Sequence, residues 1–440
     1  MKNRIKTIVM LFCVVLLLTG CTLRTVDEMY RLPRRSETDD NLQSTINEAM
    51  AGLNYAAPLA GENQQTVQMA DLNGDGKIEY IVFARDNANK AIRILIFDQF
   101  DDSFRLFAMI ESHGSAFEQV EYVDIDGKPG LEMVVGRQVS DQVLRSLSVY
   151  TFSDDTPEQM MTASYMKFLT CDLDENGKTE LLLIQPGESD ADRGVVTLYS
   201  HDQGSLQRSR EVLLSASAGS VKRIMASRLE SGENAVFVAS SVDESAVITD
   251  VFTIRDGSLN NISVSKESGN SVQTLRNYYV YADDIDGDGV LELPSLITMR
   301  DIRSSTSSGQ QYLIRWYSMD ISGQEHTKGH TFHNYVGGWY LQLNSSRASR
   351  ITVEQMGGVY VFYLWDEFYQ SATPLFTLYV FTGSARDEEA VKNGRFALYR
   401  SEGIAYAASL SEAAAEYAIT EDYLIESFRL IRQDWQTGET

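Results

Sequence analysis

Cysteine is scarce in this chain of 440 residues, which contains only three. Cys13 lies within an N-terminal apolar run and Cys21 directly follows it, so Cys171 is the only thiol further along the chain. If Cys13 is removed with that run and Cys21 is modified, no intramolecular disulfide can form in the mature chain. Such a domain needs a large core or another stabilising device, and a hydrophobic content of 43% allows a large core.

An excess of basic residues is also missing. The chain has 38 lysines and arginines against 62 aspartates and glutamates, which gives a formal net charge of −24. This charge argues against nucleic acid and anionic membrane surfaces as partners. Much of the acidity lies in short repeated segments, which carry the strongest functional signal.

No hydrophobic run is long enough to cross a membrane. The run from Ile8 to Leu18 has 11 residues, whereas a spanning helix needs roughly 20. Basic residues precede it and Leu-Thr-Gly-Cys21 ends it, which predicts a signal peptide over residues 1–20. The ending resembles the bacterial lipobox, which implies a lipoprotein with a diacylglyceryl group on Cys21. We therefore expect a protein outside the cytoplasm, anchored to the bacterial cell membrane; an ordinary secretory signal with a chance cysteine is the alternative.

Motifs of common enzymes are absent as well. The sequence contains no Gly-rich phosphate loop, no nucleophile elbow and no metalloprotease helix. The absence favours a binding protein over an enzyme and leaves the substrate of any enzyme open.

Four nine-residue segments align without gaps. They begin at residues 71, 124, 172 and 284, and we call them loops one to four. The starts differ by 53, 48 and 112 residues, the last being twice 56, so a fifth copy should lie between loops three and four. The four segments are Asp71-Leu-Asn-Gly-Asp-Gly-Lys-Ile-Glu79, Asp124-Ile-Asp-Gly-Lys-Pro-Gly-Leu-Glu132, Asp172-Leu-Asp-Glu-Asn-Gly-Lys-Thr-Glu180 and Asp284-Ile-Asp-Gly-Asp-Gly-Val-Leu-Glu292.

The fifth copy is found at Met225–Val238, which matches Met69–Val82 in frame. Its segment 227–235, here called the degenerate loop, has lost its acids at the ligand positions. Ser227, Leu229, Ser231 and Ala235 replace them. We expect this loop to be free of metal.

A period near 50 to 57 residues predicts an all-β fold, a β-propeller of four-stranded blades. Apolar runs of the kind found in buried strands follow the loops, as in Ile78–Ala84 and Leu131–Gly136. A sixth unit without an acidic loop is expected from Trp339 to Leu410, so six blades are predicted, with seven as the alternative count.

Short helices are expected at both ends of the propeller. Asp39 or Asp40 can cap a helix with Leu42, Ile46, Met50 and Leu53 on one face, and Thr420 can start another near the C-terminus. The expected organisation is a signal peptide (1–20), a tether (21–38), an N-terminal helix and lead-in (39–63), the propeller (64–410) and C-terminal helices (411–440).

Each loop has the ligand pattern of a hard-cation site. Positions one, three and five offer short oxygen side chains, position seven offers a backbone carbonyl, and position nine is glutamate. This pattern suits Ca²⁺, because soft metals prefer His or Cys and Mg²⁺ demands tighter geometry. We predict about three structural calcium sites, with ligands Asp71, Asn73, Asp75, Lys77 and Glu79; Asp172, Asp174, Asn176, Lys178 and Glu180; and Asp284, Asp286, Asp288, Val290 and Glu292.

The loops should differ in affinity. Loop four has acids at all four side-chain positions, so it is predicted to bind most tightly. In loop two Lys128 stands at position five, where its ammonium could take the place of the ion and bridge Asp124 to Asp126. Loop two is therefore expected to be empty or weak.

These loops resemble the calcium loops of FG-GAP or VCBS repeats, as in the propeller of the integrin α-subunit. The resemblance covers residues 64–300 clearly. It implies a calcium-stabilised propeller that serves as a binding scaffold. In that family the ninth position is often Asp and seven blades are usual, whereas this chain has Glu and six discernible units.

Two other groups of residues are candidates for function. His326, His330 and His333 could gather a transition metal if their segment curled back, although Gly323, Gly329 and Gly337 favour a loop and hairpin. The segment from Tyr335 to Phe381 is rich in aromatics, which either fill blade interfaces or form a glycan platform around Trp365-Asp-Glu367.

The expected function is a non-enzymatic scaffold that binds a protein or glycan of the cell envelope. The alternative is a propeller hydrolase or lyase that acts on polysaccharide. A central funnel lined by two acids and a basic residue outside the calcium loops would favour the enzyme.

Overall fold

The computed structural model describes residues 37–86, 88, 91–101, 103–139, 145–152, 156–189, 192–202, 204–209, 211–243, 246–277, 279–301, 311–432 and 435. The predicted signal peptide and Cys21 lie outside these residues, as does the tether except for its last two residues. Those two residues already belong to helix α3 (Glu37–Ala49). No helix in the described part of the chain is both long and apolar enough to cross a membrane.

The chain is all-β, as predicted, and its strands form six antiparallel sheets that follow one another in sequence. The first sheet contains β1 (Leu53–Tyr55), β2 (Val67–Ala70), β3 (Glu79–Asp86), β4 (Ile92–Phe100) and β5 (Ser103–Ser112). The second contains β6 (Ala116–Val123), β7 (Glu132–Gln138), β8 (Arg145–Thr151) and β9 (Glu158–Tyr165). The third contains β10 (Lys167–Cys171), β11 (Glu180–Gln185), β12 (Val195–Asp202), β13 (Ser205–Arg208) and β14 (Val212–Leu213).

The remaining three sheets follow the same antiparallel plan with more variation at their edges. The fourth contains β15 (Val221–Arg228), β16 (Asn234–Ser241), β17 (Val247–Arg255) and β18 (Ser258–Asn261). The fifth contains β19 (Leu293–Thr298), β20 (Tyr312–Met319), β21 (Glu325–Asn334), β22 (Trp339–Leu343) and β28 (Phe428–Leu430). The sixth contains β23 (Ile351–Met356), β24 (Val359–Asp366), β25 (Ser371–Thr382), β26 (Phe396–Ser401) and β27 (Ile404–Leu410).

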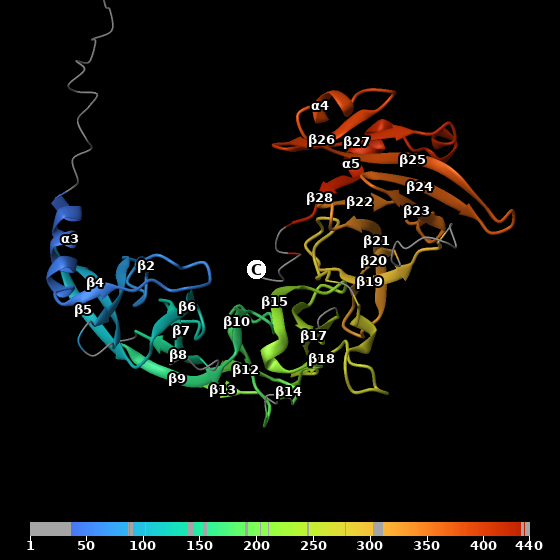
Figure 1. Ribbon diagram of the computed structural model, residues 1–440. Helices are drawn as coiled ribbons and strands as arrows, with labels where there is room; N and C mark the ends of the chain where they lie inside the picture. The colour runs from blue at the N-terminus through green and yellow to red at the C-terminus, as the bar shows by residue number, and fades with distance from the viewer. Residues whose placement is uncertain are drawn as a thin grey trace, which may run out of the picture.

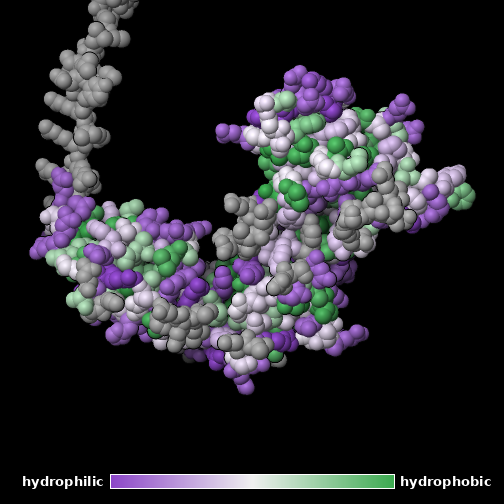
Figure 2. Space-filling model, in the orientation of Figure 1, coloured by the Kyte–Doolittle hydropathy of each residue, from purple (hydrophilic) through white to green (hydrophobic). Residues whose placement is uncertain are grey.

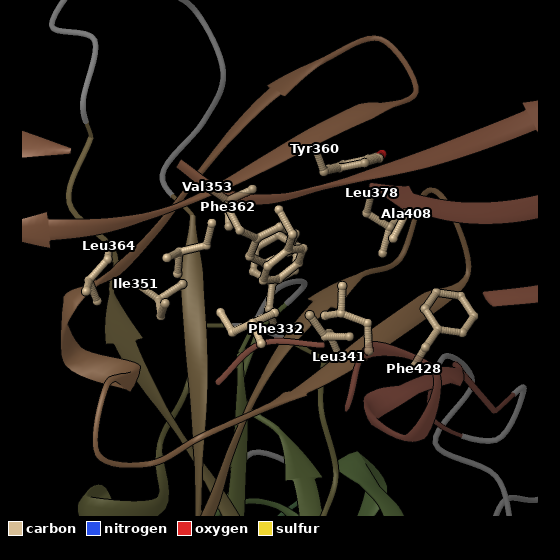
Figure 3. Close-up of a cluster of buried hydrophobic side chains, with 14 of the residues drawn as sticks. Phe332, Leu341, Ile351, Val353, Tyr360, Phe362, Leu364, Leu378, Ala408 and Phe428 are labelled. Carbon is tan, nitrogen blue, oxygen red and sulfur yellow. The ribbon is translucent and has the colours of Figure 1, made fainter. Parts of the chain in front are cut away.

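Neighbouring sheets pack face to face through alternate residues of their central strands. At the first interface Phe83 of β3 meets Phe117 of β6 edge-on, with ring centroids 5.0 Å apart. At the last interface, Figure 3 shows Tyr360 and Phe362 of β24 above Phe332 and Leu341 of the fifth sheet. Strand period two explains this arrangement, because every second side chain points to the same neighbour.

The six sheets form an open arc and not a closed ring (Figure 1). Strands β10 and β15 lie on its concave side, while β13 and β18 lie on its convex side. In a closed propeller the outer face of the first sheet would pack against the last sheet. Here Ile46 and Met50 pack on that face, against Val82, Leu95 and Phe97. Of the residues expected on the apolar face of the N-terminal helix, Ile46 is buried and Leu42 packs beside it; Met50 lies just after the last residue of α3, Leu53 belongs to β1, and α3 begins before Asp39.

The C-terminal segment also fails to join the first and last sheets. After a 3₁₀ turn at Ala414–Tyr417, Thr420 caps α5 (Glu421–Ser427) by accepting a hydrogen bond from the Tyr423 amide at 3.1 Å. The chain then forms β28, which pairs with β22 of the fifth sheet. The region predicted as C-terminal helices therefore also contains a strand, and Trp339–Leu343 belongs to the fifth sheet, so the sixth sheet begins at Ile351.

Candidate metal centres

Each acidic loop is folded around its first aspartate and leads directly into a strand, which is β3, β7, β11 or β19. The Asp71 carboxylate accepts hydrogen bonds from the amides of Gly74 at 2.8 Å and Gly76 at 3.0 Å. In loop four, Asp284 accepts from Gly287 at 2.7 Å and Gly289 at 2.9 Å. The glycine at position six has a φ of +81° in loop one, a conformation that costs glycine little. The repeated sequence thus produces a repeated backbone conformation.

The ninth residue of each loop brings a carboxylate under the turn. Glu79, Glu180 and Glu292 are 1%, 2% and 0% exposed. The amide at position two donates to each of them, from Leu72 at 2.7 Å, Leu173 at 2.7 Å and Ile285 at 3.0 Å. Glu132 of loop two is bound in the same way by the Ile125 amide at 2.8 Å.

These glutamates are costly to keep ionised without a cation. Burial, with a contribution from neighbouring aspartates, raises the pKa of Glu79, Glu180 and Glu292 to about 7. Burial also raises the pKa of Glu132. The Oε1 atom of Glu292 is buried and has no hydrogen-bond partner among the described residues. A bound cation would offset the cost of burying these charges.

Three loops gather carboxylate oxygens within 4.8 Å of one another, close enough to hold one metal ion. The groups are Asp124, Asp126 and Glu132; Asp172, Asp174 and Glu180; and Asp284, Asp286 and Glu292. Loop one has Asn73 at position three, so an amide oxygen stands where the other loops have a carboxylate. The structure therefore brings together three of the five ligands predicted for each of loops three and four, and an equivalent group in loop two.

The lysine predicted to oppose metal binding in loop two is in place. The Lys128 ammonium lies 2.6 Å from Asp126 Oδ2. Burial would raise the pKa of Asp126, but the hydrogen bonds and charge of Lys128 hold it below its usual value. One of the three carboxylates in loop two is thus already neutralised by the chain itself.

Consecutive loops are joined by hydrogen bonds that the sequence did not predict. The residue at position eight donates to the position-one carbonyl oxygen of the preceding loop. The bonds run from Leu131 N to Asp71 O at 3.0 Å, from Thr179 N to Asp124 O at 2.7 Å and from Asn234 Nδ2 to Asp172 O at 2.6 Å. Between the degenerate loop and loop four, a parallel bridge pairs Arg228 with Val290. The loops thus form one row, in which the degenerate loop keeps its place without its acids.

Replacing Gly74 by alanine tests this row. Gly74 has a φ of +75°, and a Cβ atom there would lie 2.4 Å from the Pro129 backbone of loop two. Gly76 has a similar φ of +81°, but a Cβ atom there would meet nothing within 4 Å. Backbone strain alone should cost about 1 kcal/mol at either position, so we expect Gly74→Ala to cost about 1–3 kcal/mol more than Gly76→Ala because of the clash. Equal losses in denaturant unfolding would show that loops one and two do not support each other.

The three histidines do not form a metal site. They lie on β21, where the register pairs His326 with Ser318 and His330 with Arg315, three residues apart on β20, so these two histidines lie on opposite faces of the sheet. His326 contacts Asp320 at 3.2 Å and His330 contacts Ser345 at 3.0 Å. His333 is buried and stacks on Trp435, and burial lowers its pKa to about 3.

Most of the aromatic segment fills interfaces, in agreement with the simpler of the two interpretations. Trp339 and Tyr360 are buried, whereas the Arg300 guanidinium lies 4.6 Å above the Trp365 ring and pairs with Glu367. Of this segment, Phe368 and Tyr369 are strongly exposed, at 85% and 74%. In the view of Figure 2, hydrophobic patches are scattered among hydrophilic ones and form no continuous face.

A pocket of about 220 Å³ adjoins loop four. It is lined by Asp286 of the loop, by residues of β20, β21 and β22, and by the turn that follows β22. Its charged or titratable lining residues are Asp286, Lys328 and His330.

No family model matches the chain, and no curated protein matches it. Among solved structures, it is similar to the exotype rhamnogalacturonan lyase YesX, with a TM-score of 0.30 and 12% identity over 74% of this chain and 65% of that chain. A Bacillus licheniformis rhamnogalacturonan lyase PL11 gives 0.30 and 12% over 73% and 72%. Saccharomyces cerevisiae Sqt1 gives 0.31 and 9% over 71% and 89%. None of these similarities is strong enough to assign an activity.

Proposed function

We propose that this chain is a calcium-stabilised array of propeller-type blades, held at the outer face of the cell membrane by a lipid on Cys21. In this proposal it acts as a scaffold for an envelope protein or glycan. The observation that carries the calcium part is the repeated loop geometry, in which a buried glutamate and two aspartates converge within 4.8 Å. The lipid anchor and the partner class rest on the sequence.

Calcium fits the donor set better than other common cations. Loop three offers carboxylates from Asp172, Asp174 and Glu180, the Asn176 amide and a backbone carbonyl at Lys178. Flexible oxygen coordination of this kind is typical of Ca²⁺. Since each loop borders the next, an ion that fixes one loop also fixes its contact with the neighbouring sheet. The proposed role of the ions is therefore structural.

Calcium should raise the thermal stability of the chain. An ion that binds the folded state alone stabilises it by about 1.4 kcal/mol per site at a free concentration roughly tenfold above Kd. We expect a higher Tm in calcium than in chelator, measured by circular dichroism on the mature chain without its lipid. Magnesium at the same concentration is the control. An unchanged Tm, with no calcium retained after dialysis, would contradict the proposal.

The polysaccharide-acting alternative needs two acids and a basic residue around a common cavity, outside the calcium loops. The pocket beside loop four contains Lys328 and His330, but its only acid is Asp286, which belongs to the loop. The binding scaffold is therefore the function that we retain.

A further inference from the structure

Lys328 is directed at loop four by an irregularity in strand β21. Thr327 pairs with Tyr317 of β20 and Gly329 pairs with Trp316, so Lys328 is an extra residue between two consecutive pairs. Such a β-bulge turns the side chain of its extra residue out of the regular strand pattern. The backbone is thus arranged to aim this lysine away from its own sheet face.

The ammonium group of Lys328 lies between two carboxylates that come from different loops. Its Nζ atom is 2.8 Å from Glu230 Oε2 and 3.0 Å from Asp288 Oδ2. Glu230 belongs to the degenerate loop, and Asp288 is the fifth-position ligand of loop four. The lysine side chain is 19% exposed, so water screens these pairs less than it screens fully exposed ones. The hydrogen bonds that its ammonium donates to both carboxylates raise the pKa of Lys328.

Loop four also contains the most deeply buried of the three predicted ligand glutamates. Glu292 is fully buried, one of its oxygens meets Asp284 and Asp286 within 4.8 Å, and its Oε1 atom has no partner among the described residues. A cation bound there would offset the burial of Glu292, yet one of the oxygens that would bind it is held by Lys328. The prediction that loop four binds calcium most tightly rests on its four acids alone and does not include Lys328.

We propose that Lys328 is the resident cation of loop four and must leave Asp288 before calcium binds. This inference rests on the proposed calcium binding and concerns its regulation. The displaced ammonium keeps its pair with Glu230 and borders the adjoining pocket, which also contains His330 and Ser345. Loop four then binds calcium more weakly than loop three, where no ion pair reaches Asp172, Asp174 or Glu180 within the described parts of the chain.

The tryptophans provide a probe that is specific for loop four. The chain has four, at 316, 339, 365 and 435, and all of them follow loop four in sequence. Trp316 lines the same pocket as Asp286. Terbium bound in loop four, excited at wavelengths where only tryptophan absorbs, should therefore luminesce. The sheets that contain loops one to three have no tryptophan, so terbium bound there should not. Calcium affinity at loop four is then measured by displacement of terbium.

Lys328→Met is expected to tighten calcium binding at loop four by about three- to tenfold, because partly exposed ion pairs of this kind are modest in strength. Lys222→Met is the control: it removes the same charge from an exposed position on β15, outside every loop. It should leave calcium binding at loop four unchanged. An unchanged or weaker affinity in Lys328→Met, or an equal gain in Lys222→Met, would overturn the inference.

Glu230→Gln separates displacement from a general charge effect. Without Glu230 the displaced ammonium has no second carboxylate, so calcium binding at loop four should weaken by about two- to fivefold. In the Lys328→Met background the same change should have little effect, and an undiminished effect there would refute the role given to Glu230. If calcium raises the Tm but loop four binds none in either the native chain or Lys328→Met, this inference fails and the proposed function stands. If calcium raises no Tm, the proposed function itself fails.

Discussion

Replacing Trp435 by alanine should lower the free energy of unfolding by about 3–5 kcal/mol. Trp435 is 1% exposed although it lies only five residues from the C-terminal end of the sequence. Its ring stacks on His333 at 5.2 Å and packs beside Trp316 at 6.0 Å and Tyr340 at 5.3 Å. Removing it would leave a cavity in the fifth sheet, which urea unfolding would detect as a lower midpoint.

The Trp435→Ala substitution should also affect loop four. The Trp435 indole donates to Asp283 Oδ2 at 2.5 Å, and Asp283 exchanges two backbone hydrogen bonds with Glu292 at 3.1 and 2.9 Å. We therefore expect Trp435→Ala to weaken calcium binding in loop four as well. Trp435→Phe is the control, because it keeps a stacking ring while losing the donor and part of the indole volume, and it should cost about 1–2 kcal/mol. A loss below 1 kcal/mol in Trp435→Ala would show that the C-terminal segment does not support the fifth sheet.

Asp250→Ala should be about as destabilising, with an expected loss of about 3–5 kcal/mol. Asp250 is a fully buried carboxylate on β17. Its oxygens accept hydrogen bonds from Ser215 N at 2.7 Å, Ser215 Oγ at 2.5 Å, Asn261 Nδ2 at 2.8 Å and Ser271 Oγ at 2.6 Å. Alanine would remove the acceptor from these buried and partly buried donors, and each donor left unsatisfied adds its own desolvation cost.

Two variants isolate the contribution of these bonds. Asp250→Asn keeps the shape but places an NH₂ group among donors, so it should cost nearly as much as alanine. Asp202→Ala removes an exposed carboxylate at the end of β12 and should change stability by less than about 0.5 kcal/mol. If denaturant unfolding gave similar losses for Asp250→Ala and Asp202→Ala, Asp250 would have no structural role.

The repeated loops were predictable from sequence because their chemistry is local. Each loop forms most of its hydrogen bonds within nine residues, so the spacing of Asp, Gly and Glu contains nearly all the information. The degenerate loop could be placed for the same reason, since its frame survives in Met225–Val238, where β15 pairs with β16. The ion pair between Lys128 and Asp126 spans two residues and was also predictable.

The features that were missed depend on contacts between distant parts of the chain. Lys328 is 40 residues from Asp288, and only a bulge in β21 directs it there. Trp435 is 152 residues from Asp283, and no periodicity links them. The expectation of a closed propeller was wrong. The length of a repeat describes one sheet, whereas closure of the ring depends on what packs on the first and last sheets.

Because helix α3 covers the first sheet, the fold does not have to close into a symmetric ring. In a ring every blade must turn by the same fraction of a circle, so gaining or losing one blade disturbs all interfaces. In this arc each sheet meets only its neighbours, and stability is expected to be a sum of nearest-neighbour terms, as in solenoid proteins. Such a chain can lengthen by duplication of a sheet within the arc, and can unfold from either end without opening the rest.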